Sequence, residues 1–174
     1  MMFFYDYYWL ILIPVVVAMI ASANVNSTYR KYQQVANSRG LTGEMAARKI
    51  LDANGLFNVR IEHIAGKLSD HFDPRDNVVR LSDSTFASSS VAAVGVAAHE
   101  VGHAIQYAEN YTPIRIRMAI LPVAQFGSSA WILFFILGIV FNMPILRGIG
   151  IGLFAAIVLF QLITLPVEFN ASHR

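Results

Sequence analysis

Two long apolar stretches limit most strongly what this chain can fold into. Residues 118–141 and 148–166 contain no Asp, Glu, Lys or Arg, and only Asn142 to Arg147 separates them. A helix of roughly 20 apolar residues crosses the hydrocarbon core of a bilayer. We therefore expect residues 118–166 to form a transmembrane hairpin with a short turn that contains Pro144.

A third apolar stretch, Tyr7 to Ala23, lies near the N-terminus beside an aromatic group that includes Trp9. It lacks the basic start of a cleaved signal peptide, so we expect residues 1–24 to form an uncleaved anchor. The chain is then predicted to have three transmembrane helices. Hydrophobic residues make up 56% of it and charged residues 14%, which disfavours a soluble protein with the same helices in its core.

The basic residues indicate the orientation. Eleven of the 13 Lys and Arg lie between residues 25 and 117, and the other two are Arg147 and Arg174. The positive-inside rule places residues 25–117 on the cytoplasmic side of the membrane. The absence of cysteine agrees with a reducing compartment, and a net charge of +2 gives no reason to expect a nucleic-acid partner.

Residues 25–117 are predicted to form one small α+β domain. Thr42 can cap a helix that ends near Asn54. Residues 57–63 then alternate between apolar and polar side chains, and residues 78–81 form a second short apolar run after a turn-rich segment. This order of helix, small sheet and helix is the minimal layout of a zincin-like domain.

The second helix of that domain carries the sequence His99-Glu100-Val101-Gly102-His103. Two histidines four residues apart lie on one helix face and can bind the same Zn²⁺. Glu100 lies about 100° further around the helix, where it can act as a general base beside the metal. The alternative is a core helix with two hydrogen-bonded histidines.

A catalytic zinc also needs a third protein ligand and an open fourth position. Because the hairpin returns residues 167–174 to the side of His99 and His103, Glu168 is the predicted third ligand. His71, His173 and Asp70 are its rivals for the ligand position. His71 and His173 are also candidates for a group that orients a ligand or donates to the transition state. The alternative for His71 is an ordinary turn residue, and the alternative for His173 is a solvated residue. His63 is expected to be an ordinary sheet residue.

The chain resembles the bacterial YugP-like family of membrane-bound neutral zinc metallopeptidases. Four segments carry the resemblance: Asn37 to Gly43, Leu68 to Arg75, Ala98 to Gln106 and Leu165 to Ser172. The resemblance implies a gluzincin-like site in a bacterial plasma membrane protein, with His99, His103 and Glu168 on zinc and Glu100 as the base. It also implies that members continue further, so that residues 167–174 would be a truncated segment.

More remotely, the segment around Glu168 is similar to that of the CAAX prenyl protease group. That group usually has an Asp four residues after its Glu, where this chain has Ser172. The support that this aspartate would give a metal ligand therefore cannot be assumed for Ser172.

The predicted function is that of a zinc metalloendopeptidase, with the lipid bilayer and peptide or protein substrates, including membrane-associated ones, as its partners. An intramembrane site-two-type protease is a first alternative, but it predicts an aspartate ligand in a later apolar helix. Neither 118–141 nor 148–166 contains one. A non-enzymatic zinc-binding membrane protein is a second alternative, and Glu100 argues against it because neither packing nor metal binding requires that residue.

Overall fold

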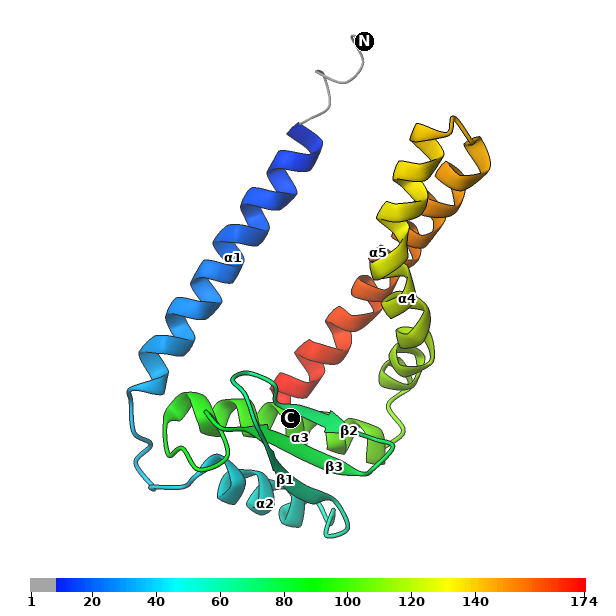
Figure 1. Ribbon diagram of the computed structural model, residues 1–174. Helices are drawn as coiled ribbons and strands as arrows, with labels where there is room; N and C mark the ends of the chain where they lie inside the picture. The colour runs from blue at the N-terminus through cyan, green and yellow to red at the C-terminus, as the bar shows by residue number, and fades with distance from the viewer. Residues whose placement is uncertain (1–8) are drawn as a thin grey trace.

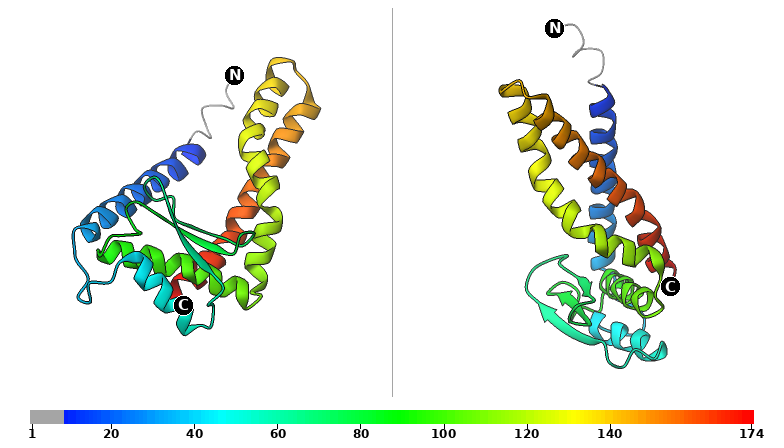
Figure 2. Two further views of the ribbon diagram at one scale, coloured as in Figure 1. Left: turned by 60° about the horizontal axis from the view of Figure 1, so that its bottom comes forward. Right: turned by 90° about the vertical axis from the view of Figure 1, so that its right-hand side faces the viewer.

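The computed structural model describes residues 9–174, and Figure 1 shows how its helices and strands are arranged. In chain order the elements are α1 Trp9–Gln33, α2 Gly43–Ala53, β1 Arg60–Ile64, β2 His71–Asp73, β3 Val78–Ser82, α3 Val91–Ala108, α4 Thr112–Val140 and α5 Pro144–His173. The elements α2, β1–β3 and α3 form a compact unit. α1 and the α4–α5 hairpin extend from the same side of it (Figures 1 and 2).

The sheet has the order β1-β3-β2, with β1 parallel and β2 antiparallel to the central strand β3. Val78, Val79 and Leu81 of β3 are fully buried, which fits the apolar run predicted at 78–81. The predicted strand at 57–63 begins later, at Arg60, because the chain first turns at Leu56, whose carbonyl accepts a hydrogen bond from the Val59 amide. β2 is left as an edge strand.

Hydroxyl caps start both helices of the compact unit. Thr42 Oγ1 accepts a hydrogen bond from the Met45 amide at 3.2 Å, and Ser90 Oγ accepts one from the Ala93 amide at 3.1 Å. α2 stops before Gly55, whose φ of +71° lies in the left-handed region that favours glycine. The predicted start of α2 at Thr42 is therefore confirmed.

One hydrophobic core joins α2, the sheet and α3. Leu51 of α2, Leu81 of β3 and Val101 of α3 are fully buried within it. Val101 lies two residues from both His99 and His103, and residues two apart in a helix point to nearly opposite sides. The side of α3 that packs in the core therefore faces away from the two histidines. The predicted order of helix, small sheet and helix is confirmed, in a protein that is mostly helical as a whole.

The two helices of the hairpin are longer than predicted. α5 begins directly at Pro144, which is favourable in the first turn, so the turn is confined to residues 141–143. At its other end α5 continues through Pro166 to His173 and carries Glu168. The helices pack closely at Gly150, where a Cβ atom would lie 2.8 Å from the Trp131 carbonyl oxygen.

Among the described residues, two helices are long and apolar enough to cross a membrane, α4 and α5, whereas the sequence predicted three. Residues 1–8 of the third, the predicted anchor, lie outside the described residues. α1 does not end near residue 24. It continues to Gln33 through polar residues, among them Asn26, Arg30 and Lys31, which lower the mean hydropathy of its second half. The aromatic residues at positions 5, 7 and 8 lie outside the described residues.

The end of α5 crosses α3 at Gly102. A Cβ atom on Gly102 would lie 2.4 Å from the carbonyl oxygen of Ala171, so the two backbones are closer than any other side chain would allow. Gly95, on the same helix, has open space around the same position.

The difference between Gly102 and Gly95 allows a test of the close contact between α3 and α5. Gly102→Ala is expected to push α5 away from α3 and to destabilise the protein by roughly 1–3 kcal/mol through overpacking. Gly95→Ala is the matched control, and it should be neutral or slightly stabilising because alanine favours a helix by about 1 kcal/mol. Thermal unfolding of both variants in detergent measures the difference. Equal melting temperatures would contradict the close approach.

Candidate metal centre

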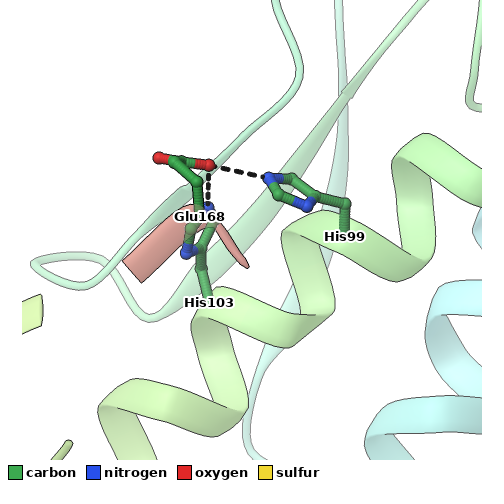
Figure 3. Close-up of side chains that lie close together, drawn as sticks. All are labelled: His99, His103 and Glu168. Atoms are coloured by element: carbon green, nitrogen blue, oxygen red, sulfur yellow. Dashed lines mark hydrogen bonds and ion pairs between the residues drawn. The ribbon is translucent and has the colours of Figure 1, made fainter. Parts of the chain in front are cut away.

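Three potential metal ligands come together where α5 crosses α3 (Figure 3). His99 Nε2 lies 3.0 Å and His103 Nε2 lies 3.4 Å from the same carboxylate oxygen, Oε2 of Glu168. One ligand atom from each residue lies within 4.8 Å of the others. The structure therefore brings together the three residues predicted to hold zinc, although 65 residues separate His103 from Glu168 in the sequence.

These ligands open into a pocket of about 200 Å³. Glu100 lines the same pocket beside the two histidines but is not one of the three clustered ligands. The opposite wall consists of Asp70, His71, Phe72 and Pro74, and the start of α4 contributes Ile114, Arg117 and Met118. A substrate that enters the pocket would meet the ligand set, the two additional carboxylates of Asp70 and Glu100, and the guanidinium of Arg117.

A buried amide orients His103. Gln106 Oε1 lies 3.0 Å from His103 Nδ1, and Gln106 Nε2 donates to the Val167 carbonyl at 2.8 Å and to Asn170 Oδ1 at 2.9 Å. Arg174 Nε donates to the same Asn170 oxygen at 2.7 Å, which identifies that atom as an acceptor. The Gln106 nitrogen must then face Asn170, and its oxygen must face His103. His103 Nδ1–H therefore donates to Gln106, which directs Nε2 to the metal position.

His99 has a partner on α5 as well. Its Nδ1 lies 3.0 Å from Ser172 Oγ, while its Nε2 faces Glu168. Ser172 thus occupies the position at which the more remote relatives were expected to have an aspartate, and its hydroxyl contacts the imidazole directly. Both histidines are therefore linked to α5. His99 contacts Ser172 of α5 directly, and His103 is linked through Gln106, which donates to Val167 and Asn170 of α5.

The electrostatics of the cluster follow from these contacts. Hydrogen bonds from His103 and His99 hold the pKa of Glu168 far below its ordinary value. The hydrogen bond to Glu168 raises the pKa of His99. Burial raises the pKa of Glu100, because desolvation penalises its charged form. Of the two carboxyl groups, Glu168 stays ionised as a ligand must, and Glu100 has the raised pKa expected of a proton acceptor.

The donor set fits a catalytic zinc. Two imidazole nitrogens and one carboxylate oxygen are the ligands of the two-histidine, one-glutamate zinc sites, which leave a fourth position open. Here all three residues line one pocket, from which a bound ion would be within reach. The family resemblance and the geometry agree on His99, His103 and Glu168.

The remaining sequence candidates are placed differently. His71 begins β2 and lines the pocket, with its Nδ1 2.8 Å from the Ser69 carbonyl oxygen. His173 is exposed at the end of α5 and is not among the residues that line the pocket. His63 pairs with Asp83 at 2.7 Å, as expected of a sheet residue with a hydrogen-bond partner.

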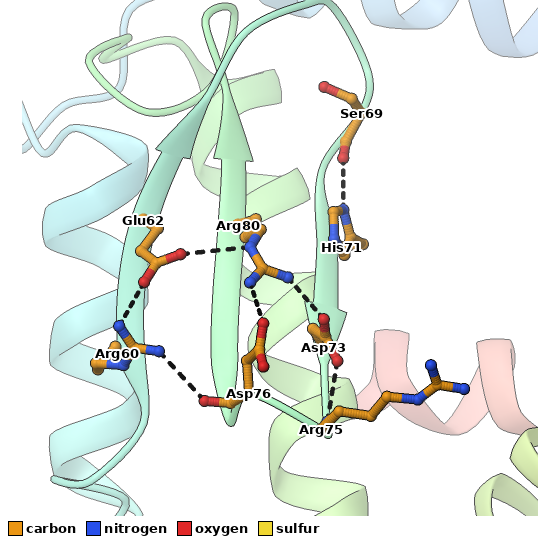
Figure 4. Close-up of polar contacts among 8 residues, drawn as sticks. All are labelled: Arg60, Glu62, Ser69, His71, Asp73, Arg75, Asp76 and Arg80. Atoms are coloured by element: carbon orange, nitrogen blue, oxygen red, sulfur yellow. Dashed lines mark hydrogen bonds and ion pairs between the residues drawn. The ribbon is translucent and has the colours of Figure 1, made fainter.

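The pocket wall formed by β2 is fastened to the sheet by Arg80 of β3 (Figure 4). Arg80 contacts Asp73 at 2.7 Å, Asp76 at 2.5 Å and Glu62 at 3.3 Å, and so connects all three strands. The guanidinium lowers the pKa of Asp73. This network keeps the short edge strand, with His71 and Phe72, in place beside the ligands.

Sequence reasoning missed Gln106 and Arg117. Gln106 lies three residues after His103 on the same helix, a spacing at which two side chains meet, so the pattern contained a signal. Arg117 contacts Glu168 across two helices, and no spacing along the chain indicates that contact.

The role of Gln106 is open to a direct test. Gln106→Leu keeps the volume but removes the acceptor of His103 and the donor to α5, so zinc affinity is expected to fall roughly 10- to 100-fold. Gln34→Leu, at an exposed position outside the site, is the control. Zinc dissociation constants from competition with a chromogenic chelator compare the two. Wild-type affinity in Gln106→Leu would show that the amide does not orient the ligand.

The comparisons with known proteins identify the family of the chain. Residues 7–174 match the model of a family described as "Putative neutral zinc metallopeptidase". The chain is 49% identical over 154 residues to a Bacillus subtilis (strain 168) protein named "Putative membrane protease YugP", an alignment that covers 88% of this chain and 68% of that protein. No solved structure matches the chain.

Proposed function

We propose, from the premise that the chain belongs to this family of neutral zinc metallopeptidases, that it is a membrane-bound zinc metalloendopeptidase. One observation carries the proposal: Glu168 reaches both histidines of the HExxH helix, and Glu100 lines the same pocket. A protein that only stored or sensed zinc would have no use for an additional, partly buried carboxylate in the pocket that the ligand set lines.

The residues divide the reaction between them. His99, His103 and Glu168 would hold Zn²⁺, which when bound lowers the pKa of water and polarises a carbonyl group. Glu100 accepts a proton from the attacking water and later passes it to the nitrogen of the leaving amine. Its place in the pocket beside both histidines suits the two steps.

The edge strand beside the ligands suggests how a substrate binds. β2 pairs only with β3 among the described strands, so its other edge can pair with an extended peptide through main-chain hydrogen bonds. His71 and Phe72 of this strand line the pocket, which would bring the bound peptide past Glu100. Since His71 Nδ1–H donates to the Ser69 carbonyl, we propose that the imidazolium form of His71 donates from Nε2 to the reacting carbonyl oxygen; His173 does not line the pocket.

The test of catalysis is Glu100→Gln. This change removes the proton acceptor but none of the three ligands, so proteolysis of an unfolded protein substrate is expected to fall by at least roughly 100-fold while zinc stays bound. Glu44→Gln, at an exposed position of α2, is the matched control. Zinc content by mass spectrometry accompanies the rate measurement. Equal rates for Glu100→Gln and wild type would exclude this mechanism.

Two alternatives make other predictions. In a site-two-type protease α3 would itself lie in the membrane, but here it packs between α2, the sheet and α5. In a non-enzymatic zinc protein, Glu100→Gln would have no activity to remove, and wild type would cleave nothing under conditions in which zinc is bound. The endopeptidase reading is favoured by the family and by the position of Glu100.

We further propose that the protein lies in the bacterial plasma membrane, with residues 25–117 as its catalytic domain on the cytoplasmic side. The relative's name includes the word membrane, and α4 and α5 are long enough to cross one. Eleven of the 13 basic residues lie in that domain. Peptide bonds near the membrane surface, in membrane-associated proteins among others, would then be within reach of the site.

The absence of cysteine allows a clean test of this orientation. Met143→Cys in the hairpin turn and Arg75→Cys in the β2–β3 turn are both exposed and each provides a single thiol. In spheroplasts, a membrane-impermeant thiol reagent is expected to label Met143→Cys directly and Arg75→Cys only after lysis. The reverse pattern would place the catalytic domain outside the cell.

A further inference from the structure

Arg117 of α4 contacts the predicted third ligand from the side opposite the histidines. Its Nη2 lies 3.2 Å from Oε1 of Glu168, whereas Oε2 of the same carboxylate faces the Nε2 atoms of His99 and His103. Each carboxylate oxygen thus has its own partners. The Arg117 side chain is 26% exposed and lines the pocket, so bulk water screens the contact only in part.

The charges in the pocket indicate that the contact between Arg117 and Glu168 matters for metal binding. Three carboxylates line it, those of Asp70, Glu100 and Glu168, and Arg117 is the lone Lys or Arg among the described lining residues. With a divalent ion bound and the histidines neutral, these formal charges cancel. Without the guanidinium the loaded pocket would hold an excess negative charge beside Glu100.

We propose that Arg117 is a positioning residue that holds Oε1 of Glu168 and leaves Oε2 as the single ligand oxygen. The inference rests on the proposed zinc site. A carboxylate with a free second oxygen can rotate about its side-chain bonds or bind through both oxygens, and a guanidinium on one oxygen restricts both motions. Because Arg117 lies at the start of α4 and Glu168 near the end of α5, the contact also connects the two hairpin helices at the metal position.

A role in stability alone would leave a different signature. An ion pair that is partly exposed contributes little to folding and does not discriminate between the free and the metal-bound protein. A positioning role instead changes metal affinity and the ligand geometry while the metal-free protein melts nearly as before. The test therefore measures metal binding as well as stability.

The experiment compares Arg117→Gln and Arg117→Lys with Arg115→Gln in the full chain purified in detergent. Arg115 is an exposed arginine of the same first turns of α4 and contacts Asn110, so it controls for the loss of a charge there. Zinc dissociation constants come from chelator competition, and the absorption spectrum of the Co²⁺-substituted protein reports the coordination geometry.

We expect Arg117→Gln to weaken zinc binding roughly 10- to 100-fold and to change the Co²⁺ spectrum. Arg117→Lys should recover part of the affinity, because it keeps the charge without the planar fork. Arg115→Gln should bind zinc as wild type does. Zinc affinity and Co²⁺ spectrum unchanged in Arg117→Gln would overturn the proposal.

Glu168→Gln distinguishes this failure from failure of the metal site itself. If Glu168→Gln loses zinc binding and Arg117→Gln does not, the three-ligand site stands and only the role of Arg117 is wrong. If wild type binds no zinc, or Glu168→Gln binds it as tightly as wild type, the proposed function fails and the inference about Arg117 fails with it.

Discussion

The close contact between α3 and α5 is the constraint on which the site depends. Gly102 lies between the two histidines along α3, and its missing side chain lets the Ala171 backbone approach. Glu168 and Ser172 lie within one turn of Ala171 on α5, so the same approach brings both to the imidazoles. A larger residue at position 102 would separate the helices and with them the ligands.

This contact divides the metal centre between two parts of the fold. The compact unit supplies His99, His103 and Glu100, the proposed general base, and the apolar hairpin supplies Glu168 and Arg117. Neither part contains a complete ligand set. The hairpin is therefore more than a membrane anchor, because its docking on α3 assembles the site. A change that displaces the hairpin would therefore displace Glu168 from the two histidines, even if the compact unit stayed folded.

Local features of the sequence predicted much of this structure. Thr42 and Ser90 start helices because their side chains and the following amides form caps within a few residues. The HExxH spacing and the side of the membrane to which the hairpin returns predicted the three residues that cluster in the structure, His99, His103 and Glu168. The ends of the helices were less readable: α5 continues through Pro166 where the apolar pattern stops, and α1 continues to Gln33 beyond its apolar part.

The choice of side chain at position 106 shows what the structure adds to such patterns. The buried site offers one N–H, from His103, and two acceptors, from Val167 and Asn170. A carboxylate there could accept from the histidine but could donate to neither oxygen, and it would carry a fully buried charge. An apolar side chain would leave all three groups unpaired. Of these alternatives, only an amide satisfies both helices at once, and that requirement becomes visible only when α3 and α5 are seen in contact.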